Sequence, residues 1–391
     1  MIAIPPKSPA LSKTRIAAAL SLLEKAGHTP IEPPVLQPAD VFLDLIGEDI
    51  RRRLFLTTGP DGADLCLRPD FTIPVCRQHL ADGGTAPADY VYNGLVFRQR
   101  ADGTGEIPQL GAESLGRADL DGADADMLAL SSSVLATLGV EDQDIRIGDE
   151  TLFAAVLSGL NLPAAWQRRL RGLFGEGQKL TDAIARMAGT GQSAGDASRD
   201  ESRDVRFGFL SALEGVAPEA AHAVVEDLLS IAGISAVGGR TPSEIADRFL
   251  EQAALAGGNG TNAQAAAVLS RYLAINGPAD QALDQLRLFA ADSGIDLQLP
   301  IQTFAARLKA LEARGVAASQ LHFAADFGRR LDYYSGFVFE IHARSGADEG
   351  QLVGGGRYDR LVTLLGAESD VPAIGFSVWL DRVAKTCGED A

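Results

Sequence analysis

The sequence is poor in the residues that build disulfide frameworks and metal sites. Three cysteines occur among 391 residues, and none stands at the C-x-x-C spacing of a zinc site. The five histidines are spread along the chain. These counts exclude a disulfide scaffold and predict no metal site. So few cysteines are also typical of a protein in a reducing compartment, which predicts the cytoplasm.

Several nucleotide-binding and membrane signals are missing as well. The sequence has no G-x-x-x-x-G-K-[ST] phosphate loop and no G-x-G-x-x-G after a predicted strand. We therefore expect no bound cofactor. It has no run of about 18 apolar residues, and residues 1–7 lack the apolar core of a signal peptide. We therefore expect neither a membrane span nor secretion.

The chain has few cations relative to its acids. Lys and Arg number 35 against 52 Asp and Glu, which gives a net charge of −17 and a pI near 4.7. Nucleic-acid binding needs clustered cations that neutralise phosphates, so we expect no nucleic-acid partner. With 46% apolar and 22% charged residues, the composition is that of a globular protein, and the length predicts two or three domains.

Sheet-forming segments occur in the first and the last part of the chain. Residues 12–26 predict a helix that Ser12 caps and Gly27 ends. Four prolines between positions 30 and 38 exclude a helix there. The pattern further predicts strands at residues 65–67, 89–97, 109–116, 320–327, 337–343 and 373–376, a tight turn at 354–359, and helices at 358–365 and 378–386.

Residues 151–312 have a different character. Alanine and leucine recur at helical spacing there, and aromatic residues become rare. Two breaks that are low in apolar residues, at 189–204 and 257–262, indicate a mobile segment and a loop. We therefore predict an all-helical insertion at residues 151–312, set into a core made of residues 1–150 and 313–391.

Polar residues near the ends of two predicted strands are candidates for a ligand site. Asp70 and Thr72 stand two apart, so both can face one cavity and hold an ammonium group. Alternatively, Asp70 caps a turn. Arg98 and Arg100 alternate onto one face, where two like charges suit an anion or line a solvated surface.

A second group of candidates combines acids, amides, guanidiniums and phenols. Gln109 and Glu113 are four apart on an extended segment and share a face. A buried Glu113 can accept a hydrogen bond from a ligand N–H, whereas an exposed one would have no such role. Residues 329–334 contain two arginines, one aspartate and two tyrosines. The guanidiniums suit a ligand carboxylate, and the tyrosine hydroxyls can also contact a ligand. Alternatively, the segment forms a structural Asp–Arg pair with core tyrosines.

In this order and at these separations, the segments resemble the catalytic core of class II aminoacyl-tRNA synthetases, and within it the histidyl-tRNA synthetase branch. The matching segments are residues 33–34 (motif 1, which builds a dimer interface), 96–98 (motif 2), 375–382 (motif 3), and 329–334, 338–340 and 355–359, which are specific to the histidyl branch. The resemblance covers roughly residues 8–150 and 315–385. It implies an α+β fold, with an antiparallel sheet flanked by helices, and a homodimer.

The resemblance also implies a pocket for histidine. Its residues would be Asp70, Thr72 and Gln109 for the α-amino group, Arg98 and Arg329 for the carboxylate, Glu113 and Tyr334 for the imidazole nitrogens, and Tyr333 beside them. The family usually has Glu where Asp70 stands. The set is chemically coherent, because acids and an amide suit an ammonium group and arginines suit a carboxylate.

Some positions depart from the synthetase pattern. Arg100 stands where the family has an acidic residue near the adenine, and residues 101–103 replace an Arg-Pro-Gln continuation. Trp379 replaces a small glycine, and an indole that buries about 200 Å² is expected to fill space that ATP needs. The chain ends nine residues after Arg382, where the family continues into an anticodon-binding domain. We therefore expect that tRNA charging has been lost.

A synthetase-like core that keeps the amino-acid pocket and departs at the ATP site resembles the regulatory subunits of ATP phosphoribosyltransferase, the first enzyme of histidine biosynthesis. This resemblance implies a non-catalytic subunit, a short-form catalytic partner subunit and feedback by histidine. Two alternatives stay open: a working aminoacyl-tRNA synthetase, and a stand-alone paralogue that acts on another amino-acid or protein substrate.

Overall fold

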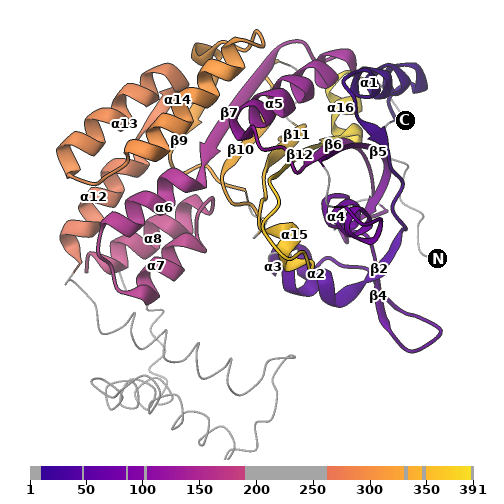
Figure 1. The fold of residues 1–391 in the computed structure, drawn as a ribbon, viewed down its shortest axis with the longest axis horizontal. Helices are drawn as coiled ribbons and strands as arrows, with labels where there is room; N and C mark the ends of the chain where they lie inside the picture. Colours follow the sequence, from indigo (N-terminus) through magenta and orange to yellow (C-terminus); the bar gives the residue numbers. More distant parts are fainter. Residues whose placement is uncertain are drawn as a thin grey trace, which may run out of the picture. The chain divides into compact units, whose positions relative to one another are not determined.

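The computed structural model describes residues 10–45, 48–84, 87–100, 104–189, 262–329, 333–345 and 349–388. The chain divides into two compact units (Figure 1). Unit 1 comprises residues 1–155 and 273–391, and unit 2 comprises residues 156–272. All the residues predicted to form the ligand pocket belong to unit 1.

A nine-stranded sheet forms the centre of unit 1. In spatial order its strands are β1 (Thr29–Pro30), β5 (Ala88–Phe97), β6 (Glu106–Leu115), β12 (Ala373–Trp379), β11 (Val353–Arg357), β10 (Phe337–Ala343), β7 (Gln143–Asp149), β9 (Leu321–Ala324) and β8 (Asn276–Pro278). β1 pairs with β5, and β7 with β9, in parallel, and the other neighbours are antiparallel. A smaller sheet joins β2 (Leu36–Pro38), β4 (Asp64–Leu67) and β3 (Leu56–Thr58).

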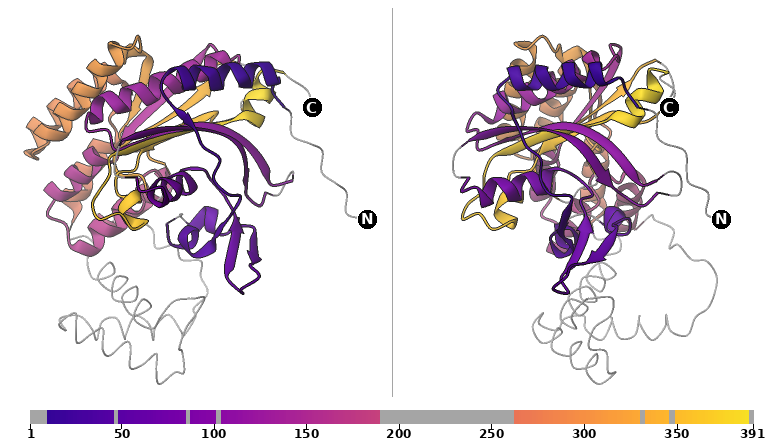
Figure 2. Two further views of the ribbon diagram at one scale, coloured as in Figure 1. Left: turned by 45° about the vertical axis from the view of Figure 1, so that its right-hand side comes forward. Right: turned by 90° about the vertical axis from the view of Figure 1, so that its right-hand side faces the viewer.

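Helices cover both faces of the large sheet. α1 (Lys13–Lys25) and α5 (Leu120–Thr137) lie on one face, and α4 (Thr72–Ala81) lies on the other (Figure 2). Unit 1 also contains α2 (Ala39–Leu45), α3 (Glu48–Arg51), α13 (Ala279–Ser293), α14 (Gln298–Glu312), η1 (Ala318–Gln320), α15 (Leu361–Leu364) and α16 (Leu380–Thr386). The predicted α+β class, a mainly antiparallel sheet flanked by helices, is confirmed.

Local sequence signals placed many of these elements correctly. The Ser12 side chain accepts a hydrogen bond from the Arg15 backbone N–H at the start of α1, and Gly27 follows its end with φ of 101°. The strands predicted at residues 89–97 and 337–343 are β5 and β10. The predicted last strand is longer than expected, because β12 continues to Trp379 and α16 begins only at Leu380.

The segment 354–359 is not the tight turn that its glycines suggested. Residues up to Arg357 form β11, a buried strand between β10 and β12. A Cβ atom on Gly354 would collide with the Arg329 guanidinium, and one on Gly355 would collide with the Phe339 ring. The turn prediction was wrong because these glycines make room for neighbouring side chains and do not bend the chain.

The predicted all-helical insertion at residues 151–312 needs a correction. It contains β8, which is a strand of the large sheet. The units also divide the chain elsewhere, since α13 and α14 belong to unit 1 and only residues 156–272 form unit 2. Helical periodicity marked these segments as helices but did not show against which unit they pack.

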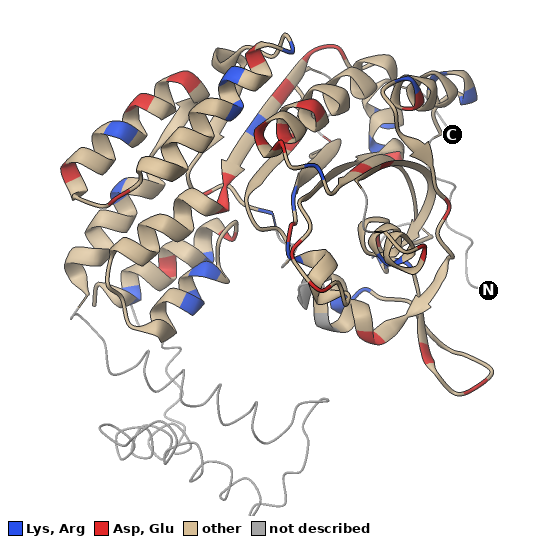
Figure 3. Cartoon of the chain, in the orientation of Figure 1, with Lys and Arg blue, Asp and Glu red and all other residues tan. Residues whose placement is uncertain are grey.

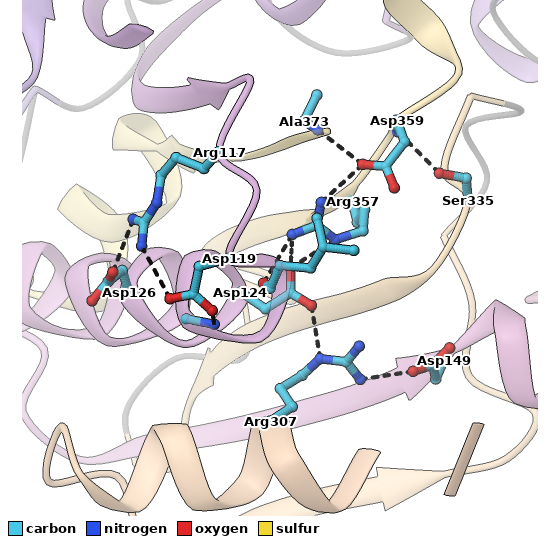
Figure 4. Close-up of polar contacts among 12 residues, drawn as sticks. Arg117, Asp119, Asp124, Asp126, Asp149, Arg307, Ser335, Arg357, Asp359 and Ala373 are labelled. Atoms are coloured by element: carbon cyan, nitrogen blue, oxygen red, sulfur yellow. Dashed lines mark hydrogen bonds and ion pairs between the residues drawn. The ribbon is translucent and has the colours of Figure 1, made fainter. Parts of the chain in front are cut away.

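A buried ion network connects α14 to the rest of unit 1 (Figure 4). Arg307 on α14 donates through Nε to Asp124 on α5 and through Nη1 to Asp149 at the end of β7, both at 2.7 Å. Arg357 on β11 donates to the second oxygen of Asp124, with Nε at 2.9 Å. The two acids are fully buried, and breaking one partner of such a pair is strongly destabilising. The network therefore fixes α14 to unit 1.

The described elements of unit 2 are helices. They are the end of α6 (Glu150–Gly159), α7 (Ala164–Arg171), α8 (Gly177–Met187) and α12 (Ala263–Leu273). Each of α7, α8 and α12 buries one apolar side, with Trp166, Leu180 and Leu269 among the buried residues. The predicted breaks at 189–204 and 257–262 lie outside the described residues, apart from Gly189 and Asn262.

Among the described ranges, none of the helices has the length and hydrophobicity required to cross a bilayer. Figure 3 shows cations and acids on the helices, but the two signs are not evenly mixed: α5 carries Asp without Lys or Arg, and α7 carries Arg without Asp or Glu.

Candidate ligand-binding site

Neighbouring strands of unit 1 present polar and small residues to the face that α4 covers. On β6, Gln109 and Glu113 are four residues apart and point to the same side. On β12, Gly375 pairs with Glu113 and Trp379 pairs with Gln109. Directly paired residues share a face of the sheet, so these four residues do as well. Thr72 at the start of α4 contacts Glu113 from above this face.

Glu113 is the central group of this face, and it is 1% exposed. Its Oε1 accepts hydrogen bonds from the Thr72 hydroxyl at 2.8 Å and from the Tyr92 hydroxyl at 3.4 Å. Its Oε2 accepts a hydrogen bond from the Tyr358 hydroxyl. Burial raises the pKa of Glu113 to about 8 despite these donors. Without a nearby cation the carboxyl is therefore mostly protonated at neutral pH.

Two glycines keep the space that this arrangement needs. A Cβ atom on Gly375 would overlap the Glu113 carboxylate. A Cβ atom on Gly111, between Gln109 and Glu113, would overlap the Tyr92 hydroxyl. Glycine is required at both positions because a polar side chain from the next strand crosses directly over the backbone.

Asp70 lies in the loop between β4 and α4 and is 5% exposed. Its Oδ1 accepts a hydrogen bond from the Ile73 backbone N–H at 3.2 Å, which is the capping role that the sequence left open. Its Oδ2 is buried and has no hydrogen-bond partner among the described residues. Burial raises the pKa of Asp70 to about 6, although Arg98 opposes the shift. Capping therefore explains one oxygen of this carboxyl and leaves the other for a ligand.

Arg98 follows the end of β5 and is also buried. Its Nε donates to the Pro69 carbonyl at 2.7 Å, which places the guanidinium beside the Asp70 loop. Burial lowers the pKa of Arg98 to about 10, and the Asp70 carboxylate opposes this shift. The guanidinium carbon lies 5.2 Å from the centre of the Trp379 ring. Arg98 is therefore held between the predicted pocket and the indole.

Two predicted tyrosines complete one wall. The ring centres of Tyr333 and Tyr334 are 5.1 Å apart, and Tyr333 packs edge-on against Tyr358 at 6.0 Å. The Tyr333 side chain also hydrogen-bonds Thr72. Burial raises the pKa of both Tyr333 and Tyr334 above the usual range, so their hydroxyls stay protonated and can donate.

Arg329 is only partly available for a ligand. Its Nη1 donates to Glu340 Oε1 at 3.2 Å and to the Phe339 carbonyl at 3.4 Å. The guanidinium carbon lies 5.5 Å from the centre of the Tyr334 ring. Its Nε is buried without a hydrogen-bond partner in the described part of the chain. Arg329 therefore lies beside the pocket with one donor free.

The structure brings most of the predicted site residues together. Asp70, Thr72, Arg98, Glu113, Tyr333 and Tyr334 form one buried cluster through the contacts given above, and Arg329 borders it through Tyr334. Gln109 is 2% exposed and is placed on the same face by strand register alone.

Sequence reasoning missed the supporting residues. Tyr92 and Tyr358 both donate to Glu113, and Glu340 neutralises Arg329. Tyr358 belongs to the glycine-rich segment 355–359, and the alternation of strand 89–97 contained Tyr92, but neither pattern indicates a partner. Their roles follow from strand register, which joins residues up to 245 positions apart.

Chemically, the cluster suits a small zwitterion with N–H donors. Two buried carboxyls can accept from an ammonium group or a ring N–H, and both would ionise when a cation approaches. Two guanidiniums can donate to a carboxylate. A buried acid without a charge partner is costly, and acids perturbed in this way concentrate at functional sites.

Comparison with known proteins decides the family. A family model described as histidyl-tRNA synthetase matches residues 4–200 and 220–383. The ATP phosphoribosyltransferase regulatory subunits of Brucella ovis and Brucella canis are each 43% identical to this chain over 363 residues, which covers 92% of this chain and 93% of those proteins. The chain belongs to the family of ATP phosphoribosyltransferase regulatory subunits.

Solved structures support the same fold. An ATP phosphoribosyltransferase regulatory subunit/histidyl-tRNA synthetase from Bacillus halodurans aligns with a TM-score of 0.64 at 18% identity, over 97% of this chain and 79% of that one. Histidyl-tRNA synthetase from Nostoc sp. PCC 7120 aligns with a TM-score of 0.62 at 18% identity, over 97% of this chain and 73% of that one. This regulatory-subunit family member therefore has the fold of class II synthetases, as its motifs predicted.

Proposed function

We propose that this chain is the non-catalytic regulatory subunit of an ATP phosphoribosyltransferase and that its buried pocket binds histidine. The relatives that share 43% identity over 92% of the chain carry that name. The observation that supports the ligand is Glu113, which is 1% exposed and surrounded by three hydroxyl donors. Burial disfavours the ionised form of this carboxyl despite its three donors, and a ligand N–H or ammonium group would offset that cost.

Histidine fits the chemistry of the cluster at both ends. Its ammonium group would lie near Asp70 Oδ2, and its carboxylate would lie near Arg98 and the free donor of Arg329. Its imidazole N–H would donate to Glu113, with a tyrosine hydroxyl on the other nitrogen. Ionised Glu113 would then be stabilised by the N–H and by its three hydroxyl donors.

The transfer chemistry belongs to a partner subunit in this proposal. The sequence has no acidic phosphoribosyl-pyrophosphate loop of the type that ends in Thr-Gly-x-Thr. A regulatory name also implies a catalytic chain elsewhere, and we take it to be the short-form ATP phosphoribosyltransferase subunit. Since the enzyme consumes ATP, we place the complex in the cytoplasm.

Mixing this protein with the short-form catalytic subunit from the same cell is expected to form a complex and to raise its transferase activity. We expect this because, in the proposal, the partner subunit carries out the transfer and this chain regulates it by binding to it. Co-elution on size exclusion and a rate assay before and after mixing measure both effects. A stand-alone paralogue would be favoured if the two proteins do not co-elute and the rate does not change. That alternative further requires that the protein acts on some other amino-acid or protein substrate.

We also propose that the protein is a homodimer through the segment that resembles motif 1. Two exposed apolar residues there are Val35 and Leu36, at 40% and 50% exposure. Arg68 links this segment to Leu95, itself 37% exposed, because its backbone N–H donates to the Val35 carbonyl and its Nε donates to the Leu95 carbonyl. These residues, here called the Leu36 patch, give a second copy an apolar surface to cover.

Replacing Leu36 with Asp is expected to convert the dimer to a monomer, because it places a charge inside the Leu36 patch. Sedimentation velocity at micromolar concentration would show a species near 41 kDa for the variant and twice that mass for the wild type. Leu288→Asp is the matched control, since Leu288 is 70% exposed on α13. A wild-type monomer, or a Leu36→Asp dimer, would contradict the proposal.

A further inference from the structure

One short segment, residues 68–72, joins the ligand pocket to the Leu36 patch. At one end of it, Asp70 and Thr72 belong to the pocket, and Thr72 donates to Glu113 at 2.8 Å. At the other end, the backbone N–H of Arg68 donates to the Val35 carbonyl at 2.8 Å, within the patch. The two sites are therefore held by residues that lie next to each other in the sequence.

The side chain of Arg68 fastens two separate parts of the patch. It is buried, and its Nε donates to the Leu95 carbonyl at 2.9 Å while its Nη1 donates to the Pro33 carbonyl at 2.5 Å. Burial lowers the pKa of Arg68, and the neighbouring Glu32 carboxylate opposes the shift. A guanidinium suits this position because its planar fork can serve acceptors in different directions at once. Arg68 therefore links residues 32–35 to the end of β5.

A series of ring contacts continues from Arg68 to the pocket. The guanidinium carbon lies 4.2 Å from the centre of the Phe71 ring, within the range of cation–π attraction. The Phe71 and Tyr92 rings are stacked, with centres 4.2 Å apart and planes 13° apart, and the Tyr92 hydroxyl donates to Glu113 at 3.4 Å. A Cβ atom on Gly94 would approach the Arg68 guanidinium to 3.0 Å and the Phe71 ring to 3.1 Å. Contacts therefore run without a gap from the Leu36 patch to Glu113.

The middle of this series leaves little room for independent movement. Phe71 and Tyr92 are each buried and pack in one apolar cluster. In a close-packed interior, a ring cannot shift unless its neighbours shift as well. A second copy that covers the Leu36 patch would order its carbonyls and, through Arg68, the two rings. The pocket would then need less ordering when a ligand binds, and less ordering means tighter binding.

We propose that Arg68 is a positioning residue that couples the pocket to the Leu36 patch, so that dimerisation strengthens histidine binding. By linkage, histidine then strengthens the dimer by the same factor. This inference rests on the proposed function, because it takes histidine and a second copy as the two ligands. Couplings of this kind range from about fivefold to 150-fold, so we expect an effect of at least fivefold.

The dimer dissociation constant, with and without saturating histidine, tests the coupling. Sedimentation velocity over a dilution series should show that histidine lowers this constant at least fivefold in wild type. In Arg68→Lys, which keeps the charge but loses the planar fork, histidine should leave the constant unchanged. A merely structural Arg68 would weaken the dimer and the pocket without changing the factor that relates them. The matched control is Arg314→Lys, whose arginine donates to Asp126 on α5, and it should keep the coupling.

Phe71→Leu provides a second variant in case Arg68→Lys does not fold, because leucine keeps an apolar side chain there but cannot stack. It should also reduce the effect of histidine on the dimer. A wild type that binds histidine and dimerises with one constant in both conditions would overturn the coupling alone. So would a coupling of full size in folded Arg68→Lys and Phe71→Leu. A protein that does not bind histidine, or does not dimerise, would overturn the corresponding proposal above together with this one.

Discussion

A Glu113→Gln variant is expected to be more stable than wild type in alkaline buffer and to bind histidine at least tenfold more weakly. The stability effect follows from burial, which raises the pKa of Glu113 to about 8 from an ordinary value of 4.5. The stabilisation that the neutral carboxyl provides is complete below about pH 4.5, and it is lost as the pH rises through about 8. Gln has the same shape but does not ionise, so the variant does not lose this stabilisation as the pH rises.

The binding effect has a different cause. An ionised Glu113 accepts a hydrogen bond from a ligand N–H more strongly than an amide oxygen does. Losing one partner of a buried charged pair costs a few kcal/mol, and 1.4 kcal/mol is a tenfold change in affinity. Gain of stability together with loss of binding is the signature of a residue kept for its ligand.

Thermal unfolding at pH 6 and pH 9, with and without histidine, measures both effects. The melting temperature of Glu113→Gln should exceed that of wild type at pH 9 by more than at pH 6. Glu106→Gln, at the exposed start of the same strand, is the matched control and should change neither property. If Glu113→Gln melts below wild type at both pH values and still binds histidine normally, Glu113 is a structural residue.

Histidine affinity is expected to rise about tenfold between pH 6 and pH 8. In the free protein, burial raises the pKa of Asp70 to about 6 and that of Glu113 to about 8. A bound ammonium group and a ring N–H stabilise the ionised carboxyls, so the pKa values fall on binding and protons are released. Release of protons means that binding strengthens as the pH rises.

Calorimetric titration in two buffers of different ionisation enthalpy measures the protons released. Above pH 7 the free imidazole is mostly neutral, so release by the protein can be separated from release by the ligand. In Glu113→Gln, the histidine affinity should no longer increase between pH 7 and pH 8. An affinity that is independent of pH in wild type, or an unchanged slope in the variant, would show that Glu113 does not ionise on binding.

Local patterns predicted the parts of the fold that depend on local physics. Ser12 and Gly27 marked the ends of α1 because caps act within one turn. The alternation in residues 337–343 marked β10 because one face of it is buried. The glycines of β11 led to the wrong prediction of a turn, because a glycine in a turn and a glycine under a neighbour's side chain look alike in sequence. What distinguishes them here is the Arg329 and Phe339 side chains, which come from elsewhere in the chain.

The residue types of the site could be predicted from the sequence, whereas most of their hydrogen-bond partners could not. Asp70, Thr72 and Glu113 were named from motif order, and the structure joins them. That Tyr358 donates to Glu113 depends on the register of β6, β12 and β11, which no local pattern encodes. The same holds for Arg307, whose partner Asp124 lies 183 positions away and fixes α14 to unit 1.

The central claim is that histidine regulates the complex through this pocket, and the inhibition curve of the reconstituted complex tests it most directly. Transferase activity would be measured against histidine concentration for complexes that contain wild type, Glu113→Gln or Glu106→Gln. The account predicts that Glu113→Gln raises the concentration for half-inhibition at least tenfold, whereas Glu106→Gln leaves it unchanged. Identical curves for all three complexes would contradict the account and place the feedback site elsewhere.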